Sequence, residues 1–94
     1  MIQSERLKGI GTFVASANAG SFTAAAEQLN LTSSAVSKSV ARLEDRLGAR
    51  LFERTTRSLA LTDEGTAFYH TCVRVLADLE EAETALATQR ALFD

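Results

Sequence analysis

Apolar residues recur at helical spacing in the first thirty residues and predict two helices. The first helix carries its apolar face at Leu7, Ile10, Val14 and Ala17. Gly20 ends the connection between the first and second helices. Ser21 is suited to cap a short second helix, because its hydroxyl can accept a hydrogen bond from a free amide of the first turn. The residues that this second helix should bury are Phe22, Ala25, Ala26 and Leu29.

A third helix follows the tight break at residues 30–32 and is predicted to have two contrasting faces. Thr32 is suited to cap it, and Gly48 is suited to end it in the left-handed conformation. At about 100° per residue, one face is strictly apolar and should be buried; it consists of Val36, Val40, Leu43 and Leu47. The opposite face and its flanks are small, polar or basic; they consist of Ser34, Ser37, Lys38, Ala41 and Arg42.

Two short apolar segments, residues 51–54 and 58–61, are too short for helices and predict a two-stranded wing. Thr62 then caps a long fourth helix, whose first turn contains Asp63 and Glu64 near its positive end. The predicted fold is therefore mainly α: a winged helix-turn-helix, with three helices plus a two-stranded β wing, over residues 1–62. A long linker or dimerisation helix occupies residues 63–94.

Composition limits the possible classes of protein. The 94 residues suit one small domain, and there is neither a run of 18 apolar residues nor a basic start followed by an apolar run. We therefore expect no membrane partner. The single Cys72 cannot form an internal disulfide, which fits a reducing cytoplasm. A single His and a single Cys supply neither a metal-ligand set nor a nucleophile–base pair, so we expect no cofactor, no metal and no enzymatic activity.

Charge is distributed unevenly along the chain. The formal net charge is −2, which by itself argues against a nucleic-acid partner. Residues 1–57, however, carry a net charge of +3 and residues 58–94 a net charge of −5. All basic residues between 28 and 57 lie in or just after the third helix, so a local basic face is predicted on an acidic molecule.

That basic face has the chemistry of a DNA-reading helix. Short side chains allow close approach to base edges, and Lys38 can reach a guanine or a phosphate. Ser33 and Ser34 lie at the helix N-terminus, where amide groups favour a phosphate. The alternative is a solvated helix face that happens to be rich in serine.

The wing adds two arginines to this surface. Arg54 and Arg57 flank Thr55 and Thr56 at the expected tip, where arginine suits phosphates or a narrow minor groove. The alternative for Arg54 is a surface ion pair with Glu53 or Asp63, which would contribute little.

Residues of characteristic type recur at fixed spacing along most of the chain. These are Ala25-Ala26, Leu29, Ala35-Val36-Ser37-Lys38, Val40, Leu43-Glu44, Leu47-Gly48, Leu51-Phe52, Arg54-Thr55, and Leu61-Thr62 with Gly65. On these positions the chain, from about Leu7 to Leu86, resembles the DNA-binding domain of LysR-type transcriptional regulators.

The resemblance implies that the recognition helix enters a major groove, that Thr23 binds a phosphate and that the wing arginines lie at the minor groove or backbone. The complete set of predicted DNA-binding residues is Thr23, Thr32, Ser33, Ser34, Ser37, Lys38, Arg42, Arg54, Thr55 and Arg57. Three of these depart from the family's usual residues: Ser33 replaces a common Gln, Ser34 a common Pro, and Lys38 the more frequent Arg. A different operator, or more readout of DNA shape, is therefore expected.

The fourth helix has an apolar seam at alternating four- and three-residue spacing, which is typical of a coiled coil. Its members are Phe68, Cys72, Val75, Leu79, Ala82, Leu86 and Phe93, and Leu76 widens it. The predicted homodimer residues are Leu76, Leu79, Ala82, Leu86 and Phe93. The alternative is that the seam packs only on its own domain, as we expect for Phe68. A two-fold dimer would bind an inverted repeat in double-stranded DNA.

In this family a ligand-sensing domain of the periplasmic-binding-protein type normally follows the linker helix. The chain ends at Asp94, about where that domain would begin, so we expect a fragment that binds DNA without responding to an inducer. A small-molecule effector would act only through the missing domain, and tetramers are an alternative for the full-length protein. A competing hypothesis, supported only by the low pI, is a helical dimerisation or adaptor module that kept a winged fold without binding DNA.

Overall fold

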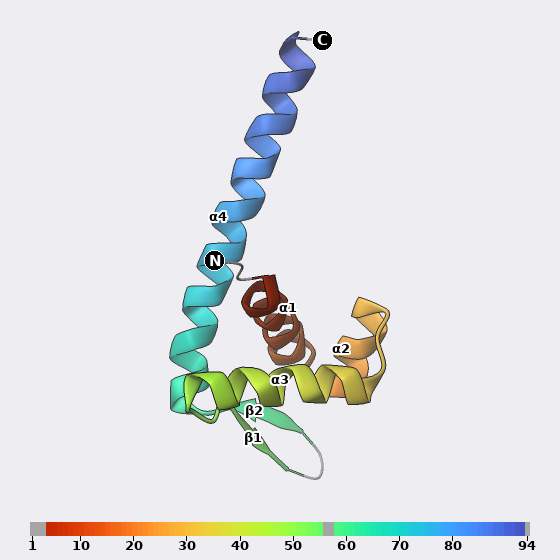
Figure 1. The fold of residues 1–94 in the computed structure, drawn as a ribbon, viewed down its shortest axis with the longest axis vertical. Coiled ribbons are helices and arrows are strands. Elements are labelled where there is room, and N and C mark those ends of the chain that lie inside the picture. The colour runs from red at the N-terminus through yellow and green to blue at the C-terminus, as the bar shows by residue number, and fades with distance from the viewer. Residues whose placement is uncertain (1–3, 56–57, 94) are drawn as a thin grey trace.

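The computed structural model describes the backbone of residues 4–55 and 58–93, and the side chains of residues 9–55 and 58–92. Its order of elements is that of the predicted winged helix-turn-helix with a long final helix (Figure 1). The elements are α1 (Ser4–Ala19), α2 (Phe22–Leu29), α3 (Ser33–Leu47), β1 (Phe52–Arg54), β2 (Leu59–Leu61) and α4 (Asp63–Phe93).

The three N-terminal helices pack on one another around an apolar core that also includes the wing and the start of α4. Phe13 of α1 is fully buried at its centre. Its ring centroid lies 5.4 Å from that of Phe52, 5.5 Å from that of Phe68 and 6.4 Å from that of Tyr69. Tilted and edge-on aromatic pairs of this kind add to the stabilisation from burial. Phe13 therefore joins α1, β1 and α4 at one point.

Side-chain caps mark the starts of α2 and α3, and a residue in the left-handed conformation marks the end of α2. The Ser21 hydroxyl accepts a bond of 3.2 Å from the Ala24 amide at the start of α2. Asn30 ends this helix with φ of 57°, and the Leu31 amide donates to the Ala26 carbonyl at 2.9 Å. The Thr32 hydroxyl then accepts from the Ala35 amide at 3.0 Å and caps α3. These bonds satisfy backbone groups that helix ends leave open, and they confirm the predicted break at residues 30–32.

The wing is an antiparallel pair in which Phe52 faces Leu61 and Arg54 faces Leu59. Phe52 is fully buried, while Leu59 and Leu61 pack in part against the core. A two-stranded ribbon needs such support, because alone it would be marginally stable. The end of β2 is also tied to the start of β1, since the Thr62 amide donates to the Leu51 carbonyl at 3.0 Å.

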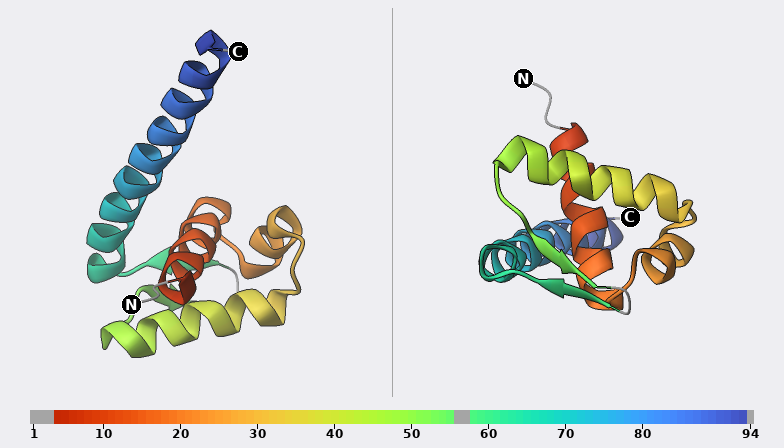
Figure 2. Two further views of the ribbon diagram at one scale, coloured as in Figure 1. Left: turned by 45° about the horizontal axis from the view of Figure 1, so that its top comes forward. Right: turned by 90° about the horizontal axis from the view of Figure 1, so that it is seen from below.

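Helix α4 begins beside the wing and then leaves the body. The Thr62 hydroxyl caps it, accepting from the Gly65 amide at 2.9 Å. Its first turns pack on α1 and β2, and the Tyr69 hydroxyl donates to the Asn18 side-chain oxygen at 2.5 Å. Beyond these turns α4 projects away from the other elements, so the molecule measures 53 × 26 × 23 Å (Figure 2). Within the described residues, no helix combines the length and the apolar character needed to cross a membrane.

Two leucines predicted to be buried are exposed. Leu29 has 37% of its surface exposed and Leu47 has 43%. Each is the last residue of its helix, where the helix has run past the elements that cover its apolar face. The remaining predicted apolar positions of α3 are confirmed as core, because Val36, Val40 and Leu43 are at most 1% exposed.

Candidate nucleic-acid interface

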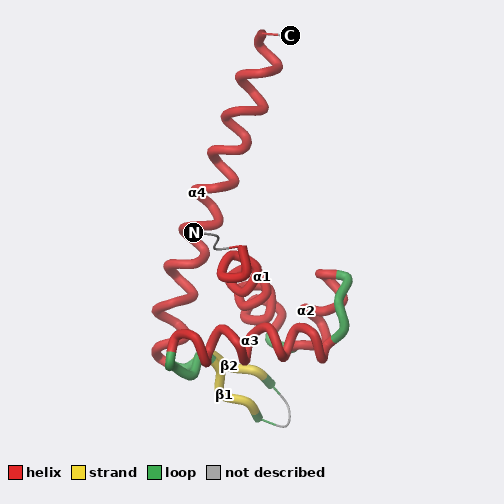
Figure 3. The backbone as a smooth tube through the Cα atoms, in the orientation of Figure 1, coloured by secondary structure: helices red, strands yellow, loops and turns green. Residues whose placement is uncertain are grey.

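Helix α3 presents the predicted small and basic residues on its outer face. Ser33, Ser34, Lys38 and Arg42 are exposed, and Ser37 is half-buried on the flank. The helix and the wing together occupy the end of the molecule opposite the far end of α4 (Figure 3). A convex helix beside a two-stranded ribbon is a shape that fits the major groove and the adjoining backbone of DNA.

The start of α3 is exposed and capped. Thr32 is exposed, and its hydroxyl oxygen accepts from the Ala35 amide, so the same hydroxyl can also donate a hydrogen bond. Ser33 and Ser34 follow in the first turn, where the helix dipole favours an anion. All three predicted contact residues therefore lie on one accessible surface.

Arg54 is held on the body rather than extending freely from the wing. Its Nη2 lies 3.1 Å from Oε1 of Glu44 on α3, and the side chains of the two residues are 37% and 11% exposed. The guanidinium carbon also lies 5.6 Å from the centre of the Phe22 ring, a cation–π distance. The alternative ion pair of Arg54 with Glu53 or Asp63 is thus wrong, since its partner comes from the recognition helix.

Thr55 is tied into the turn of the wing. Its amide donates to the Ser58 carbonyl at 3.1 Å, and its hydroxyl accepts from the Ser58 amide at 3.0 Å. This arrangement brings the two strands together at the end of the ribbon. Arg57, the second predicted wing arginine, lies outside the described residues, as does Thr56.

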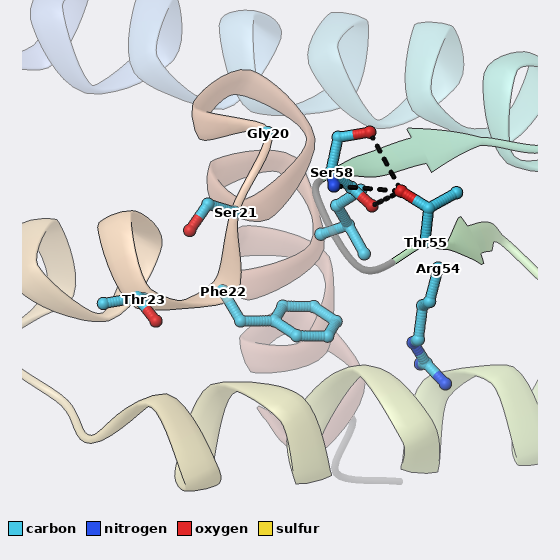
Figure 4. Close-up of a pocket in the computed structure, with 8 residues that line it drawn as sticks. Gly20, Ser21, Phe22, Thr23, Arg54, Thr55 and Ser58 are labelled. Atoms are coloured by element: carbon cyan, nitrogen blue, oxygen red, sulfur yellow. Dashed lines mark hydrogen bonds between the residues drawn. The ribbon is translucent and has the colours of Figure 1, made fainter.

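A cavity of about 340 Å³ separates the start of α2 from the wing (Figure 4). Among the described residues, its lining is rich in hydroxyls and includes the Arg54 guanidinium; these residues are Gly20, Ser21, Phe22, Thr23, Arg54, Thr55, Ser58 and Leu59. Phe22 lies between Thr23 and Arg54, so the predicted phosphate-binding threonine and the wing arginine border the same opening (Figure 4). Hydroxyl donors and a guanidinium are the groups that commonly bind phosphate oxygens of DNA.

The apolar seam of α4 divides into a covered and an uncovered part. Phe68 and Leu76 pack against the core in part, and Cys72 is 2% exposed. Burial raises the pKa of the Cys72 thiol, which suits an inert core residue rather than a redox sensor. In the outer part, Leu79 and Leu86 are 50% and 61% exposed.

The predicted dimer residues are therefore not equivalent. Leu79, Ala82 and Leu86 are exposed, whereas part of Leu76 already contacts its own domain. The side chain of Phe93 lies outside the described residues. Among the described residues there is also no group of three His, Cys, Asp or Glu side chains that could hold a metal ion.

Sequence reasoning missed Glu44 and Phe22 as partners of Arg54. Both were assigned structural positions, Glu44 within a family pattern and Phe22 in the core. Glu44 lies seven residues after Ser37, which places both on the same flank of α3 at 3.6 residues per turn. That spacing could have indicated that Glu44 faces the wing.

The short helix α2, the tight turn, the exposed helix α3 and the two-stranded ribbon define a winged helix-turn-helix protein. Residues 7–66 match the family model described as "Bacterial regulatory helix-turn-helix protein, lysR family". The chain belongs to this LysR family.

Curated relatives and solved structures agree with this assignment. The regulator CrgA of Neisseria meningitidis serogroup C (strain 8013) is 47% identical over 74 residues, which cover 79% of this chain and 25% of that protein. The transcriptional activator AaeR of Escherichia coli (strain K12) is 42% identical over 82 residues, covering 87% of this chain and 26% of that protein. This chain thus spans about a quarter of the length of the curated relatives it matches.

Two solved structures with a similar fold are complexes with DNA. The BenM_DBD/benA site 1 DNA complex has a TM-score of 0.82 at 30% identity, over 90% of this chain and 94% of that chain. The CbnR_DBD–DNA complex has a TM-score of 0.75 at 32% identity, over 94% of this chain and 98% of that chain.

Proposed function

We propose that this chain is the sequence-specific, double-stranded DNA-binding part of a dimeric LysR-type transcription regulator in the bacterial cytoplasm. The observation that carries the proposal is the exposed, small and basic face of α3 beside a wing arginine. The similarity to DNA-binding domains solved on DNA supports it independently. The relatives named above are a transcriptional regulator and a transcriptional activator, which supports a role in regulation rather than in catalysis.

In this proposal each element has its own role. Lys38 and the serines of α3 face base edges and phosphates in the major groove, where small side chains permit close approach. Thr23 and Arg54 bind the backbone from either side of the cavity between α2 and the wing. Arg57 contacts the minor groove or backbone from the turn of the wing.

A second copy of the chain completes the DNA-binding unit. The exposed leucines of α4 pair with the same surface of the partner, so that two α3 helices meet an inverted repeat. Any small-molecule effector would act through a separate ligand-sensing domain of the full-length regulator.

The test is selection of duplexes from a randomised inverted-repeat library, followed by titration at two salt concentrations. We expect one preferred sequence and an affinity that falls steeply with salt, because lysine and arginine displace counterions. The double variant Lys38→Ala plus Arg57→Ala should bind the selected duplex at least about tenfold more weakly and with a shallower salt dependence. If no sequence is selected and the double variant changes nothing, the chain is a helical dimerisation module instead.

A further inference from the structure

One carboxylate connects the recognition helix to the wing. Glu44 lies on α3, and its Oε2 accepts bonds from the backbone amides of Leu51 at 2.8 Å and Phe52 at 3.3 Å. Its Oε1 accepts from the Arg54 guanidinium at 3.1 Å. The first strand of the wing is therefore attached to α3 at its first residue, Phe52, and at the residue before it, and again at its last residue, Arg54.

The same contacts extend to α2 through Phe22. The Arg54 guanidinium carbon lies 5.6 Å from the centre of the Phe22 ring, and that ring meets Phe52 edge-on at a centroid distance of 6.0 Å. Arg54 thus touches the recognition helix through Glu44 and the start of α2 through Phe22. It is fixed at the meeting point of α2, α3 and the wing.

The sign of the charge at Glu44 conflicts with its position. A negative charge beside a surface that binds phosphates repels them, and only 11% of the Glu44 side chain is exposed to solvent that could screen it. Three donors surround the carboxylate instead, and they attach it to the wing: the amides of Leu51 and Phe52 and the guanidinium of Arg54.

We propose that Glu44 is a positioning residue for DNA binding, which fixes the wing and the Arg54 guanidinium relative to the recognition helix. This inference rests on the proposed function. Arginine has five N–H donors in a rigid plane, so one edge can pair with Glu44 while the others bind a phosphate at the cavity beside Thr23. Fixing the guanidinium in advance reduces the ordering cost on binding.

The substitution Glu44→Gln separates this positioning role from the effect of charge, because loss of positioning should weaken DNA binding whereas loss of the negative charge should tighten it. The glutamine oxygen can still accept from the amides of Leu51 and Phe52, but its NH₂ group cannot accept from Arg54. Loss of a negative charge alone would tighten DNA binding. Loss of positioning should weaken binding to the duplex selected by the wild-type chain by about tenfold.

Glu53→Gln is the matched control. Glu53 is an exposed acid on the same strand as Arg54. Removing its charge should leave binding unchanged or slightly tighter. Circular dichroism at the assay temperature checks that both variants are folded.

Glu44→Asp gives a second measurement if Glu44→Gln fails to fold. It keeps the charge but is one methylene shorter, so it cannot reach Arg54 and both amides together. Weaker DNA binding by Glu44→Asp supports the positioning role, since the negative charge of the side chain is unchanged in this variant. Binding as tight as the wild type by this variant, or by folded Glu44→Gln, overturns the inference.

Coupling to Arg54 is measured with Arg54→Lys, which keeps the charge and loses the planar fork. We expect the double variant Glu44→Gln plus Arg54→Lys to bind about as weakly as either single variant. Losses that add up would mean that Glu44 acts independently of Arg54, which overturns the inference. A wild-type chain that selects no sequence and binds no mixed-sequence duplex overturns the proposed function itself, whereas a change confined to the variants bears only on Glu44.

Discussion

The body of the molecule and the outer half of α4 use apolar residues in opposite ways. In the body, Phe13, Phe52 and Leu43 are at most 1% exposed. In outer α4, Leu79, Leu86 and Leu92 are between 50% and 78% exposed. The body thus buries its own apolar surface, whereas the outer helix exposes leucines to solvent. Two of them, Leu79 and Leu86, are seven residues apart and form a row on one face of α4. Such rows are found where a second protein surface covers them.

Charge follows the same division. The first 57 residues are net positive, and the rest of the chain, almost all of it α4, is net negative. An acidic outer helix repels DNA, so it is suited to stand away from the duplex while the basic face of α3 approaches it. One short chain can therefore hold a DNA surface and a protein surface without competition between them.

The largest expected effect concerns the close packing of the body, at Gly65. A methyl group there would lie 2.0 Å from the Leu51 carbonyl oxygen, a backbone atom that cannot turn aside. Gly65→Ala should therefore lower the free energy of unfolding by about 3 kcal/mol, as overpacking does at its upper range. Thermal unfolding followed by circular dichroism measures this change.

Gly11→Ala is the control for that substitution. Among the described residues, no atom beyond the chain neighbours of Gly11 and the adjacent backbone of helix α1 lies within 4 Å of a methyl group built there. Alanine should stabilise the chain there by about 0.5–1 kcal/mol, because glycine weakens a helix interior. Equal destabilisation by both variants would contradict the packing at Gly65.

The second largest expected effect is a loss of self-association through the outer half of α4. The double variant Leu79→Asp plus Leu86→Asp should leave the chain folded but shift it to monomers in sedimentation, because both leucines lie outside the core. Affinity for a duplex with two half-sites should fall by about a hundredfold, since the second half-site no longer binds as part of one unit.

The charge-matched control places the same two acids on the opposite side of α4. Ala77→Asp plus Thr84→Asp changes exposed residues away from the seam. It should keep the oligomeric state of the wild type. A shift to monomers in this control as well would mean that charge, not the seam, decides association.

The smallest effect concerns a cap on the surface of the body. Thr32→Ala removes the hydroxyl that accepts from the Ala35 amide at 3.0 Å, and should lower stability by about 1 kcal/mol. Thr32→Ser keeps the acceptor and should restore most of it. Urea unfolding measures both, and an alanine variant as stable as the wild type would show that the cap contributes nothing.

Local features of the fold could be predicted from the sequence. The caps at Ser21, Thr32 and Thr62 depend on neighbouring residues, and the structure confirms all three. The burial of a residue was harder to predict, because it also depends on how far along the helix the residue lies. Leu47 has the correct spacing for the apolar face of α3 but lies at its end, where other elements no longer cover it.

The candidate site could be predicted in its residues but not in its contacts. The exposure of Ser33, Ser34 and Lys38 follows from the opposite face of α3 being buried. The pairing of Arg54 with Glu44 joins residues ten positions apart on different elements. It depends on how the wing lies against α3, which no local pattern specifies.

The tie between Tyr69 and Asn18 has a mechanical consequence. Helix α4 is anchored to the body near Cys72 and continues for about 32 Å beyond it, at 1.5 Å per residue. It therefore acts as a lever arm, in which a tilt of about 10° at the base moves the far end by about 6 Å. The contacts at the base of α4, which include the hydrogen bond between Tyr69 and Asn18 and the burial of Cys72, therefore set where the tip of α4 lies.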